Sequence, residues 1–186
     1  MTINNPEITG LKIIEPRVIE DSRGYFYESY NREKMQAAGI SMEFVQDNQS
    51  KSQYGVIRGL HYQKSPFAQT KLVRVLEGSI YDVALDIRKG SPTYGQWFGL
   101  ELNSDNKLQL LIPKGFAHGF SVLSENAVVL YKCDEFYEPS AEAGIHCMDP
   151  FLKIDWKIKP GKEIISQKDL KQSLFENADH NFIFEK

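Results

Sequence analysis

Short apolar runs separated by turn residues fill the middle of the chain. Between residues 56 and 133 these runs are rich in Val, Ile, Leu, Tyr and Phe, a composition typical of β-strands. Glycine, proline or Asx residues interrupt them about every ten residues, as in all-β sandwiches and barrels. The interruptions fall at positions 77–78, 89–92, 103–106, 114–115 and 124–126. The pattern therefore predicts an all-β domain.

The same pattern predicts how some runs pair. Residues 72–76 and 80–87 are separated only by Glu77-Gly78-Ser79, so we expect them to form a β-hairpin. Two further strands are predicted over residues 12–14 and 25–29. These can pair within one subunit or with a neighbouring subunit.

Helical signals are few. Asn31 predicts the N-cap of a short helix that runs through Ala38 and ends at Gly39. Ser166 predicts the cap of a second helix that begins near Gln167. Because the chain has no repeat, low-complexity segment or linker, we expect one domain over all 186 residues, with a few short peripheral helices.

Composition narrows the function classes without naming one. With 41% hydrophobic and 25% charged residues, the chain has the composition of an ordinary soluble globular protein. A net charge of -3 argues against a general nucleic-acid binder, which normally displays a basic face. The N-terminus lacks the features of a secretory signal and no apolar run reaches transmembrane length, so we expect a cytoplasmic protein without membrane contact. Cys133 and Cys147 lack CxxC spacing and are expected to be free thiols.

The segment Arg58-Gly59-Leu60-His61-Tyr62-Gln63 puts polar chemistry into a predicted strand. Because side chains alternate across a strand, His61 shares a face with Gln63. By the same rule Lys71 shares a face with Val73. Inside a β-barrel such faces line a pocket, where a low dielectric strengthens each charge. A structural interpretation stays open for both residues, since strand histidines are often only hydrogen-bonded and edge lysines discourage aggregation.

An imidazole, an ammonium and a phenol together suit proton exchange beside a ketone. His61 would remove the acidic α-proton, Lys71 would stabilise the enolate oxygen, and Tyr131 would return a proton from the opposite side. Taken alone, Tyr131 ends an apolar run and has the alternative interpretation of a core or edge aromatic.

Asp169 has two competing interpretations. Ser166-Gln167-Lys168-Asp169 fits a capping box, with the acid at the third helical position. Alternatively, the carboxylate orients the His61 ring and stabilises its charged form, as second groups do for catalytic histidines. The spacing alone favours the cap.

A second histidine, His118, follows a Pro-x-Gly turn at residues 113–115. Its segment and the His61 strand resemble the cupin superfamily, many of whose members bind metal in a β-barrel. Metal-binding cupins usually carry two histidines one residue apart in the first motif, whereas here the residue two places after His61 is Gln63. Without a clear third ligand, no metal site is expected.

Taken together, eight segments resemble the dTDP-4-dehydrorhamnose 3,5-epimerase family of nucleotide-sugar enzymes. They are residues 21–28, 46–48, 58–63, 71, 113–120, 131–133, 142–144 and 166–169. The resemblance runs from about residue 11 to about residue 170, and the RGLHYQ and GFAHGF blocks are highly specific together. It implies a cupin-type jelly-roll β-barrel or sandwich. Residues 146–149 depart from the family pattern, and the tail from residue 177 to residue 186 matches nothing assigned.

The resemblance also implies roles for particular residues. His61 is the base that removes protons from C3 and C5 of a 4-keto-6-deoxyglucose ring, with Asp169 as its partner. Tyr131 is the acid and Lys71 holds the C4 enolate. Substrate-binding positions carry over to Arg23, Phe26, Glu28, Gln46, Asp47, Asn48, Arg58, Lys71, His118, Tyr137, Glu142 and Lys168. Among these, Tyr137 matches an aromatic that stacks on thymine, and the two arginines and Lys168 would hold the diphosphate.

Members of the family are dimers that exchange an N-terminal strand. The resemblance therefore implies a homodimer in which about the first thirty residues contact the partner, with Arg23 and Phe26 serving the neighbouring site. It implies a place in dTDP-L-rhamnose synthesis, a dTDP-sugar as substrate, and no nicotinamide or metal cofactor.

Three other functions remain as alternatives. A relative that inverts only C3 or only C5 would use the same base and acid, with pocket shape deciding. A sugar-binding cupin without turnover need not keep His61, Tyr131 and Asp169 together. A metal-dependent cupin oxygenase is disfavoured by the missing second histidine.

Overall fold

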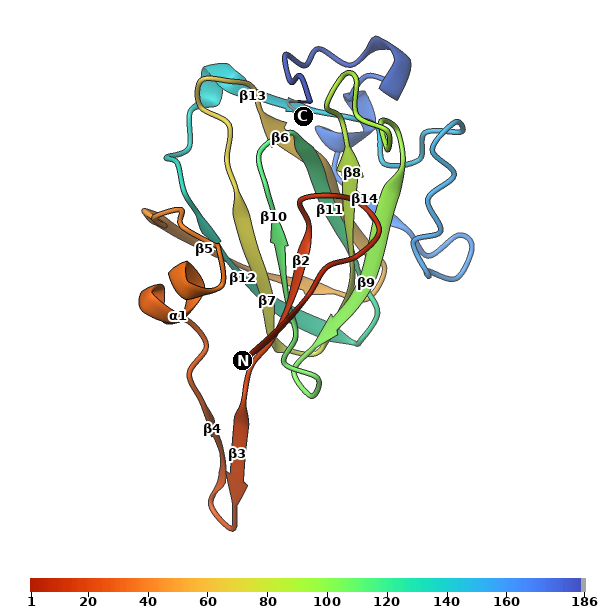
Figure 1. Cartoon of the computed structure of the whole chain (residues 1–186). Helices are drawn as coiled ribbons and strands as arrows, with labels where there is room; N and C mark the ends of the chain where they lie inside the picture. Colours follow the sequence, from red (N-terminus) through yellow and green to blue (C-terminus); the bar gives the residue numbers. More distant parts are fainter. Residues whose placement is uncertain (185–186) are drawn as a thin grey trace.

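Two facing β-sheets form the body of the molecule (Figure 1). The structure is a computed structural model that describes residues 1–184, so residues 185–186 of the predicted domain and tail lie outside it. The first sheet has the strand order β1 (Thr2–Asn4), β2 (Lys12–Glu15), β10 (Gln109–Ile112), β7 (Lys71–Glu77), β12 (Asn126–Cys133) and β5 (Gln46–Gln53). The second has the order β13 (Glu142–Gly144), β6 (Val56–Gln63), β11 (Phe116–Val122), β8 (Ser79–Asp86) and β9 (Trp97–Asn103), and β14 (Ile164–Ile165) pairs in parallel with β6. The predicted all-β fold is confirmed.

The remaining elements are short. They are the hairpin of β3 (Val18–Asp21) and β4 (Gly24–Tyr27), the helix α1 (Arg32–Ala37), and three 3-10 turns, η1 (Pro139–Ala141), η2 (Asp169–Lys171) and η3 (Phe175–Asn177). The first predicted helix is confirmed, because the Asn31 side chain accepts a hydrogen bond from the Lys34 N–H at the start of α1. The second predicted helix is wrong in extent: only η2 forms, and the chain is already extended at Gln172.

Apolar side chains are buried in three layers. Between the sheets lies a cluster that includes Val73, Val75, Ile80, Leu110, Phe120 and Val129. Behind the second sheet, Leu85 and Ala117 pack with residues of the C-terminal part of the chain such as Trp156. Behind the first sheet, Leu72 and Leu111 pack with Met35 of α1. Because both outer faces are covered, strands such as β11 are buried along their whole length.

The predicted hairpin of residues 72–76 and 80–87 is wrong. β7 pairs with β10 and β12 in the first sheet, whereas β8 pairs with β11 and β9 in the second. The chain passes between the sheets at Gly78, which has a φ of +77° and lies so close to Asn126 that a Cβ would be 2.1 Å from its backbone oxygen. The short glycine turn is real, but it is a corner of the sandwich.

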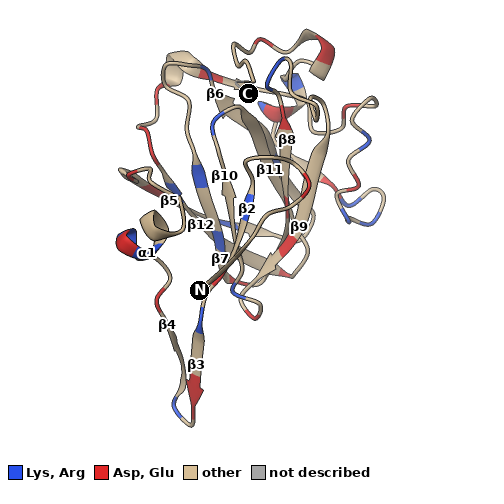
Figure 2. Cartoon of the chain, in the orientation of Figure 1, with Lys and Arg blue, Asp and Glu red and all other residues tan. Residues whose placement is uncertain are grey.

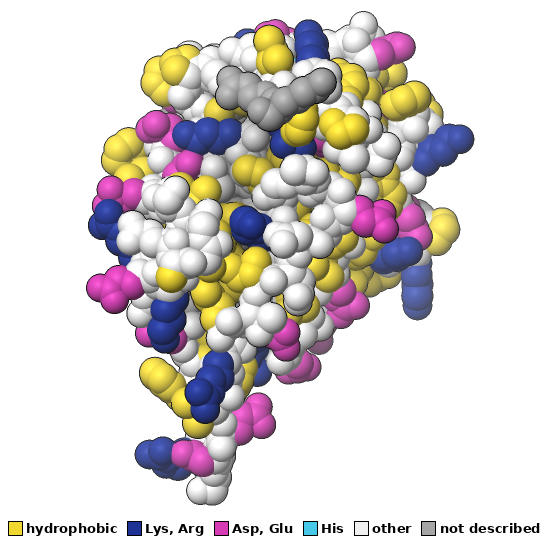
Figure 3. Space-filling model, viewed as in Figure 1, with side chains coloured by type: hydrophobic (Ala, Val, Ile, Leu, Met, Phe, Trp, Pro, Cys, Tyr) yellow, Lys and Arg dark blue, Asp and Glu magenta, His cyan; other side chains and the backbone are white. Residues whose placement is uncertain are grey.

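The β3–β4 hairpin projects away from the two sheets (Figure 1). Its apolar side chains Ile19, Tyr25 and Phe26 are 55%, 57% and 71% exposed. On the body, acidic and basic residues are interspersed (Figure 2), and the face in Figure 3 shows no continuous basic area. Within residues 1–184, no helix combines the length and apolar character needed to span a bilayer.

Candidate active site

A cleft of about 210 Å³ opens between the two sheets at one end of the barrel. Strands β5, β7 and β12 of the first sheet and β6 and β13 of the second contribute to it. Its lining consists of Gln46, Asn48, His61, Tyr62, Gln63, Gln69, Lys71, Tyr131, Tyr137 and Glu142. Seven of these ten are candidate residues from the sequence; Tyr62, Gln63 and Gln69 are the others.

His61 lies on the β6 wall and contacts Asp169. Its Nε2 is 2.6 Å from Oδ1 of Asp169, which is buried at the start of η2. Burial opposes ionisation of this carboxyl group, but the hydrogen bond with His61 and the His61 charge outweigh it, so the pKa of Asp169 stays below its ordinary value. The Ser166 hydroxyl accepts the Asp169 N–H at 3.0 Å. Half of the predicted capping box therefore forms, while the carboxylate serves His61.

Lys71 and Tyr131 lie on the opposite wall. They belong to the paired strands β7 and β12, and Nζ of Lys71 is 5.7 Å from the centre of the Tyr131 ring. Loss of bulk water lowers the pKa of Lys71, although Cys133, Asp82 and Glu142 partly offset this. Burial raises the pKa of Tyr131. A flat ring bound in the cleft would thus have an imidazole on one side and a phenol with an ammonium on the other.

A second histidine–carboxylate pair lies behind His61. His118 sits beside His61 on the neighbouring strand β11, and its Nε2 is 2.7 Å from Oδ1 of Asp82 on β8. Both side chains are buried, and burial lowers the pKa of His118 against the opposing effect of Asp82. Oδ2 of Asp82 has no hydrogen-bond partner within the described part of the chain. Sequence reasoning missed Asp82, although a carboxylate between the inward-facing Ile80 and Ala84 was a usable signal.

The rim of the cleft is open and charged. Tyr137, 52% exposed, donates its hydroxyl hydrogen bond to Glu142 at 2.7 Å, and its N–H donates to the Gln46 side chain at 3.0 Å. Nζ of Lys168 is 2.6 Å from Glu142. Burial works against ionisation of Glu142, yet the hydrogen bonds from Lys168 and Tyr137 keep its pKa below the ordinary value. An exposed aromatic ring beside a cation suits a nucleotide base and its phosphates.

Gln63, two residues after His61 on β6, fixes the loops beside the cleft. Its amide donates to the backbone oxygens of Phe67 and Phe136 at 2.6 and 3.1 Å, and its side-chain oxygen accepts from the Glu138 N–H at 2.8 Å. The residue that replaces a second metal-binding histidine therefore holds two loops together. Within the described residues no three His, Cys, Asp or Glu side chains are grouped so that they could hold a metal ion.

Several candidate residues lie away from this cleft. Asp47 alternates to the outer side of β5 and pairs with Lys132 at 2.9 Å. Arg58 is exposed and donates to the Ser52 hydroxyl at 3.0 Å. The other three are on or next to the projecting hairpin: Arg23 pairs with Asp21, Glu28 pairs with Lys34, and Phe26 is exposed.

Comparisons with known proteins agree on one family. The sequence model of the dTDP-4-dehydrorhamnose 3,5-epimerase family matches residues 5–177. The dTDP-4-dehydrorhamnose 3,5-epimerase of Shigella flexneri is 48% identical over 97% of this chain and 99% of that protein. The crystal structure of the dTDP-4-dehydrorhamnose 3,5-epimerase from Elizabethkingia anophelis superposes with a TM-score of 0.90, at 50% identity, over 95% of this chain and 97% of that one.

A further relative was solved with a ligand. The dTDP-6-deoxy-D-glucose-3,5-epimerase of Legionella pneumophila, in complex with dTDP-4-keto-L-rhamnose, superposes with a TM-score of 0.92 at 51% identity, over 96% of this chain and 94% of that one. The cupin-type jelly roll expected from the sequence is thereby confirmed. Since a family model covers most of the chain and close relatives cover nearly all of it, the chain belongs to the dTDP-4-dehydrorhamnose 3,5-epimerase family.

Proposed function

We propose that this epimerase inverts C3 and C5 of dTDP-4-dehydro-6-deoxy-D-glucose and releases dTDP-4-dehydro-L-rhamnose, in the synthesis of dTDP-L-rhamnose. One observation carries the assignment of residues: a base, His61, and an acid, Tyr131, face each other across one cleft. An epimerase needs this arrangement because inversion requires that a proton leave one face of a carbon and another arrive at the opposite face.

The contacts support the following chemistry at each carbon. Asp169 accepts the hydrogen bond from Nε2 of His61, which leaves the lone pair on Nδ1 to take the proton. The electron pair of the broken C–H bond moves onto the C4 oxygen, where the Lys71 ammonium stabilises the negative charge. Tyr131 then gives its hydroxyl proton to the other face of the same carbon. Exchange with water removes the proton from His61 and restores the one on Tyr131.

The binding roles assigned to the rim complete the proposal. Tyr137 offers an exposed ring for thymine, and Lys168 offers a cation for the diphosphate. Arg58, which lies away from the cleft and donates to Ser52, is assigned to the diphosphate by the family resemblance alone. Gln46, Asn48 and Glu142 supply polar groups beside the sugar. Asp47 lies next to this set in the chain but contacts Lys132, so its contribution would act through that lysine.

We also propose a homodimer in which the β3–β4 hairpin completes the partner's cleft. An isolated two-stranded hairpin is marginally stable in water, and this one exposes Ile19, Tyr25 and Phe26. The cleft is also smaller than the roughly 300–1,000 Å³ usual for ligand sites. The hairpin residues Arg23 and Phe26 are therefore assigned to the neighbouring site, where they would cover the nucleotide.

A mixing experiment tests this exchange. Arg23→Ala and His61→Asn chains, each inactive alone, are unfolded, mixed and refolded together. If the hairpin acts on the partner, each mixed dimer has one site with both native residues, and about a quarter of the wild-type sites recover under random C2 pairing. If the hairpin acts within its own chain, mixing restores nothing and the exchange is refuted.

The reaction itself is tested by isotope exchange. Wild-type protein is incubated with dTDP-4-dehydro-6-deoxy-D-glucose in deuterated water, and the ring protons are followed by NMR. Exchange at both C3 and C5 is expected; exchange at one carbon would support the single-site alternative, and none at all would remove the epimerase assignment. His61→Asn should abolish exchange while dTDP binding is kept, because the nucleotide contacts lie on the rim. Loss of both together would make His61 a structural residue.

A cytoplasmic location stays a prediction. It is supported by Cys133 and Cys147, which are both buried and unpaired, as is usual in a reducing compartment.

A further inference from the structure

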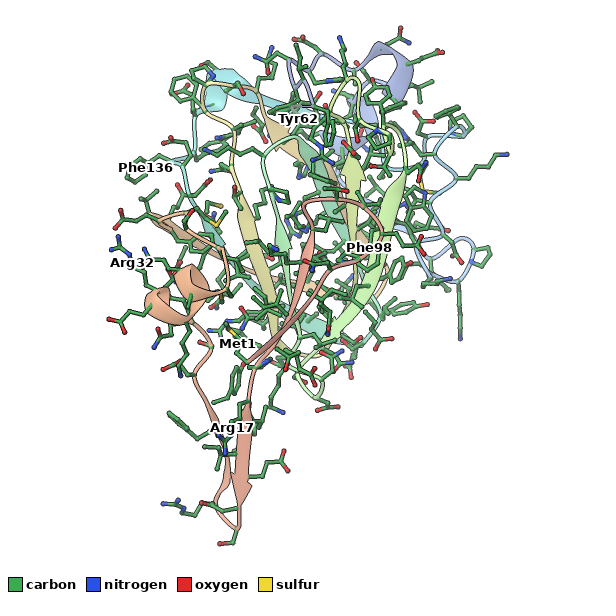
Figure 4. The ribbon with its side chains drawn as sticks, in the orientation of Figure 1. Met1, Arg17, Arg32, Tyr62, Phe98 and Phe136 are labelled. Atoms are coloured by element: carbon green, nitrogen blue, oxygen red, sulfur yellow. The ribbon has the colours of Figure 1, made fainter. Side chains whose placement is uncertain are left out.

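The C-terminal tail, residues 178–184, lies at the end of the barrel where β13 is found (Figure 1), and residues of β13 and of the end of β6 line the cleft. It follows the part of the chain that the family model matches, which ends at residue 177. The tail is tied to the end of β6: the Tyr62 hydroxyl donates to the Asp179 backbone oxygen at 3.0 Å, and the Asn181 side chain exchanges two hydrogen bonds with the backbone of Ser65, at 3.0 and 2.9 Å. Figure 4 shows Tyr62 beneath this segment.

The tail is also tied to the segment that follows β8. The Lys89 N–H donates to the Phe182 oxygen at 3.0 Å, and the Phe184 N–H donates back to the Lys89 oxygen at 2.9 Å. The Arg88 guanidinium lies 4.9 Å from the centre of the Phe184 ring. Anchored on β6 and on the chain after β8, the tail spans the end of the second sheet, in which β11 lies between these two strands.

Phe182 is the side chain of the tail that packs into the end of the barrel. It is 7% exposed and packs edge-on against Tyr62, with ring centres 6.2 Å apart. With Phe116, Gly115 and Ile112 it encloses a cavity of about 10 Å³, which is room for at most about one water molecule. His118 and four residues of the active-site cleft, Tyr62, Gln63, Gln69 and Lys71, line this cavity as well.

We propose that the tail is part of the active site, with Phe182 as a positioning residue that closes the barrel behind Lys71 and His118 and keeps bulk water from the charged enolate. The role in catalysis rests on the proposed function. Without the Phe182 ring, the small cavity would open to solvent beside the tail, and water could reach the cleft from the tail side as well as from its mouth.

Water at this place would weaken catalysis. The attraction between the Lys71 ammonium and an enolate oxygen falls as the local dielectric rises, so the stabilisation of the charged intermediate falls with it. Added water would also relieve the burial that lowers the pKa of Lys71. The ionisable groups that face Lys71 are unchanged by the substitution and are His61 on β6, Asp82 on β8, His118 on β11, Tyr131 and Cys133 on β12, and Glu142 on β13.

The test compares Phe182→Ala with Ile183→Ala, because the Ile183 side chain is 75% exposed and leaves the wall intact. Phe182→Ala should lower kcat about tenfold with little change in KM, and should move the alkaline limb of the rate profile up by about half a pH unit or more. Ile183→Ala should match the wild type. Phe182→Leu, which keeps apolar packing, should shift the profile in the same direction by less, and it serves if the alanine variant does not fold.

A readout that needs no turnover separates this inference from the proposed function. The Lys71 amine is titrated by ¹⁵N NMR in each variant, and its pKa should rise in Phe182→Ala and not in Ile183→Ala. If Phe182→Ala lowers only the thermal stability and leaves both the titration and the rate profile as in the wild type, Phe182 is a packing residue and the inference is wrong. If the wild type is inactive but the pKa of Lys71 still rises in Phe182→Ala, the proposed reaction is wrong and the role of Phe182 in excluding water stands.

Discussion

Replacing Asp169 with asparagine removes a charge and little else. The two side chains have nearly the same size, and the amide oxygen can still accept the hydrogen bond from Nε2 of His61. Because Asp169 is only 4% exposed, water cannot take over the lost charge. The substitution therefore measures how much the carboxylate stabilises His61 once the imidazole has taken a proton from the substrate.

The size of the effect follows from the contact. With Nε2 and Oδ1 2.6 Å apart, the two charge centres are about 4 Å apart, where opposite charges attract by about 4 kcal/mol at an effective dielectric constant of about 20. Since about 1.4 kcal/mol changes a rate tenfold, kcat should fall by about 10³-fold. KM should change little, because Asp169 does not line the cleft.

Steady-state kinetics and dTDP binding are measured together with the melting temperature. Asp155→Asn is the matched control: it removes a carboxylate that pairs with Lys157 at an exposed site, and it should leave the kinetics unchanged. A folded Asp169→Asn protein with kcat within about threefold of the wild type would refute the reasoning, and Asp169 would then act only in the turn that Ser166 caps.

Three further predictions concern the opposite wall and the sheet behind the base. Tyr131→Phe should lower product formation by about 10²–10⁴-fold while deuterium exchange continues, because His61 still removes protons; equal loss of both in the NMR assay would contradict the assignment of Tyr131 as acid. The alkaline fall in kcat/KM should occur at a pH below the ordinary lysine pKa, because burial lowers the pKa of Lys71 and only its ammonium form stabilises the enolate. If the Lys71→Met variant shows the same alkaline fall, the fall does not come from Lys71. Gly59→Ala should lower the free energy of unfolding, measured in urea, by about 2–4 kcal/mol. The reason is that Gly59 has a φ of +125° and that a Cβ there would lie 2.5 Å from Cα of Gly119. A loss under about 1 kcal/mol would show that β6 and β11 can move apart at this point.

Much of the site could be read from the chain because its side chains lie in strands with clear alternation. His61 lies in a predicted strand, Lys71 and Tyr131 each adjoin an apolar run, and alternation indicates which side chains share a face. The resemblance to a family then implies the roles proposed for them. Asp82 obeys the same rule, because alternation places its carboxylate on the apolar face that Ile80 and Ala84 share.

Strand pairing could not be read in the same way. The run of residues 72–76, the glycine turn and the run of residues 80–87 have the local appearance of a hairpin, yet the two strands belong to different sheets. Alternation shows which face of a strand is buried, but it does not show which strand pairs with it. The apolar residues of β7 would be buried equally well beside β8 or beside β10 and β12. The choice depends on closing both sheets over one core.

The sequence by itself determined the fold class, the first helix and the kinds of side chain available for proton transfer, since these depend on neighbours within a few residues. Only the tertiary structure decided what those side chains do together. His61 and Asp169 are 108 residues apart in sequence, and the local spacing of residues 166–169 favoured a helix-capping role for the carboxylate. The C-terminal tail has no motif, and it gains a place at the cleft only when Phe182 packs on Tyr62. Such contacts depend on the burial and charge of groups that are distant in the chain, which no local pattern records.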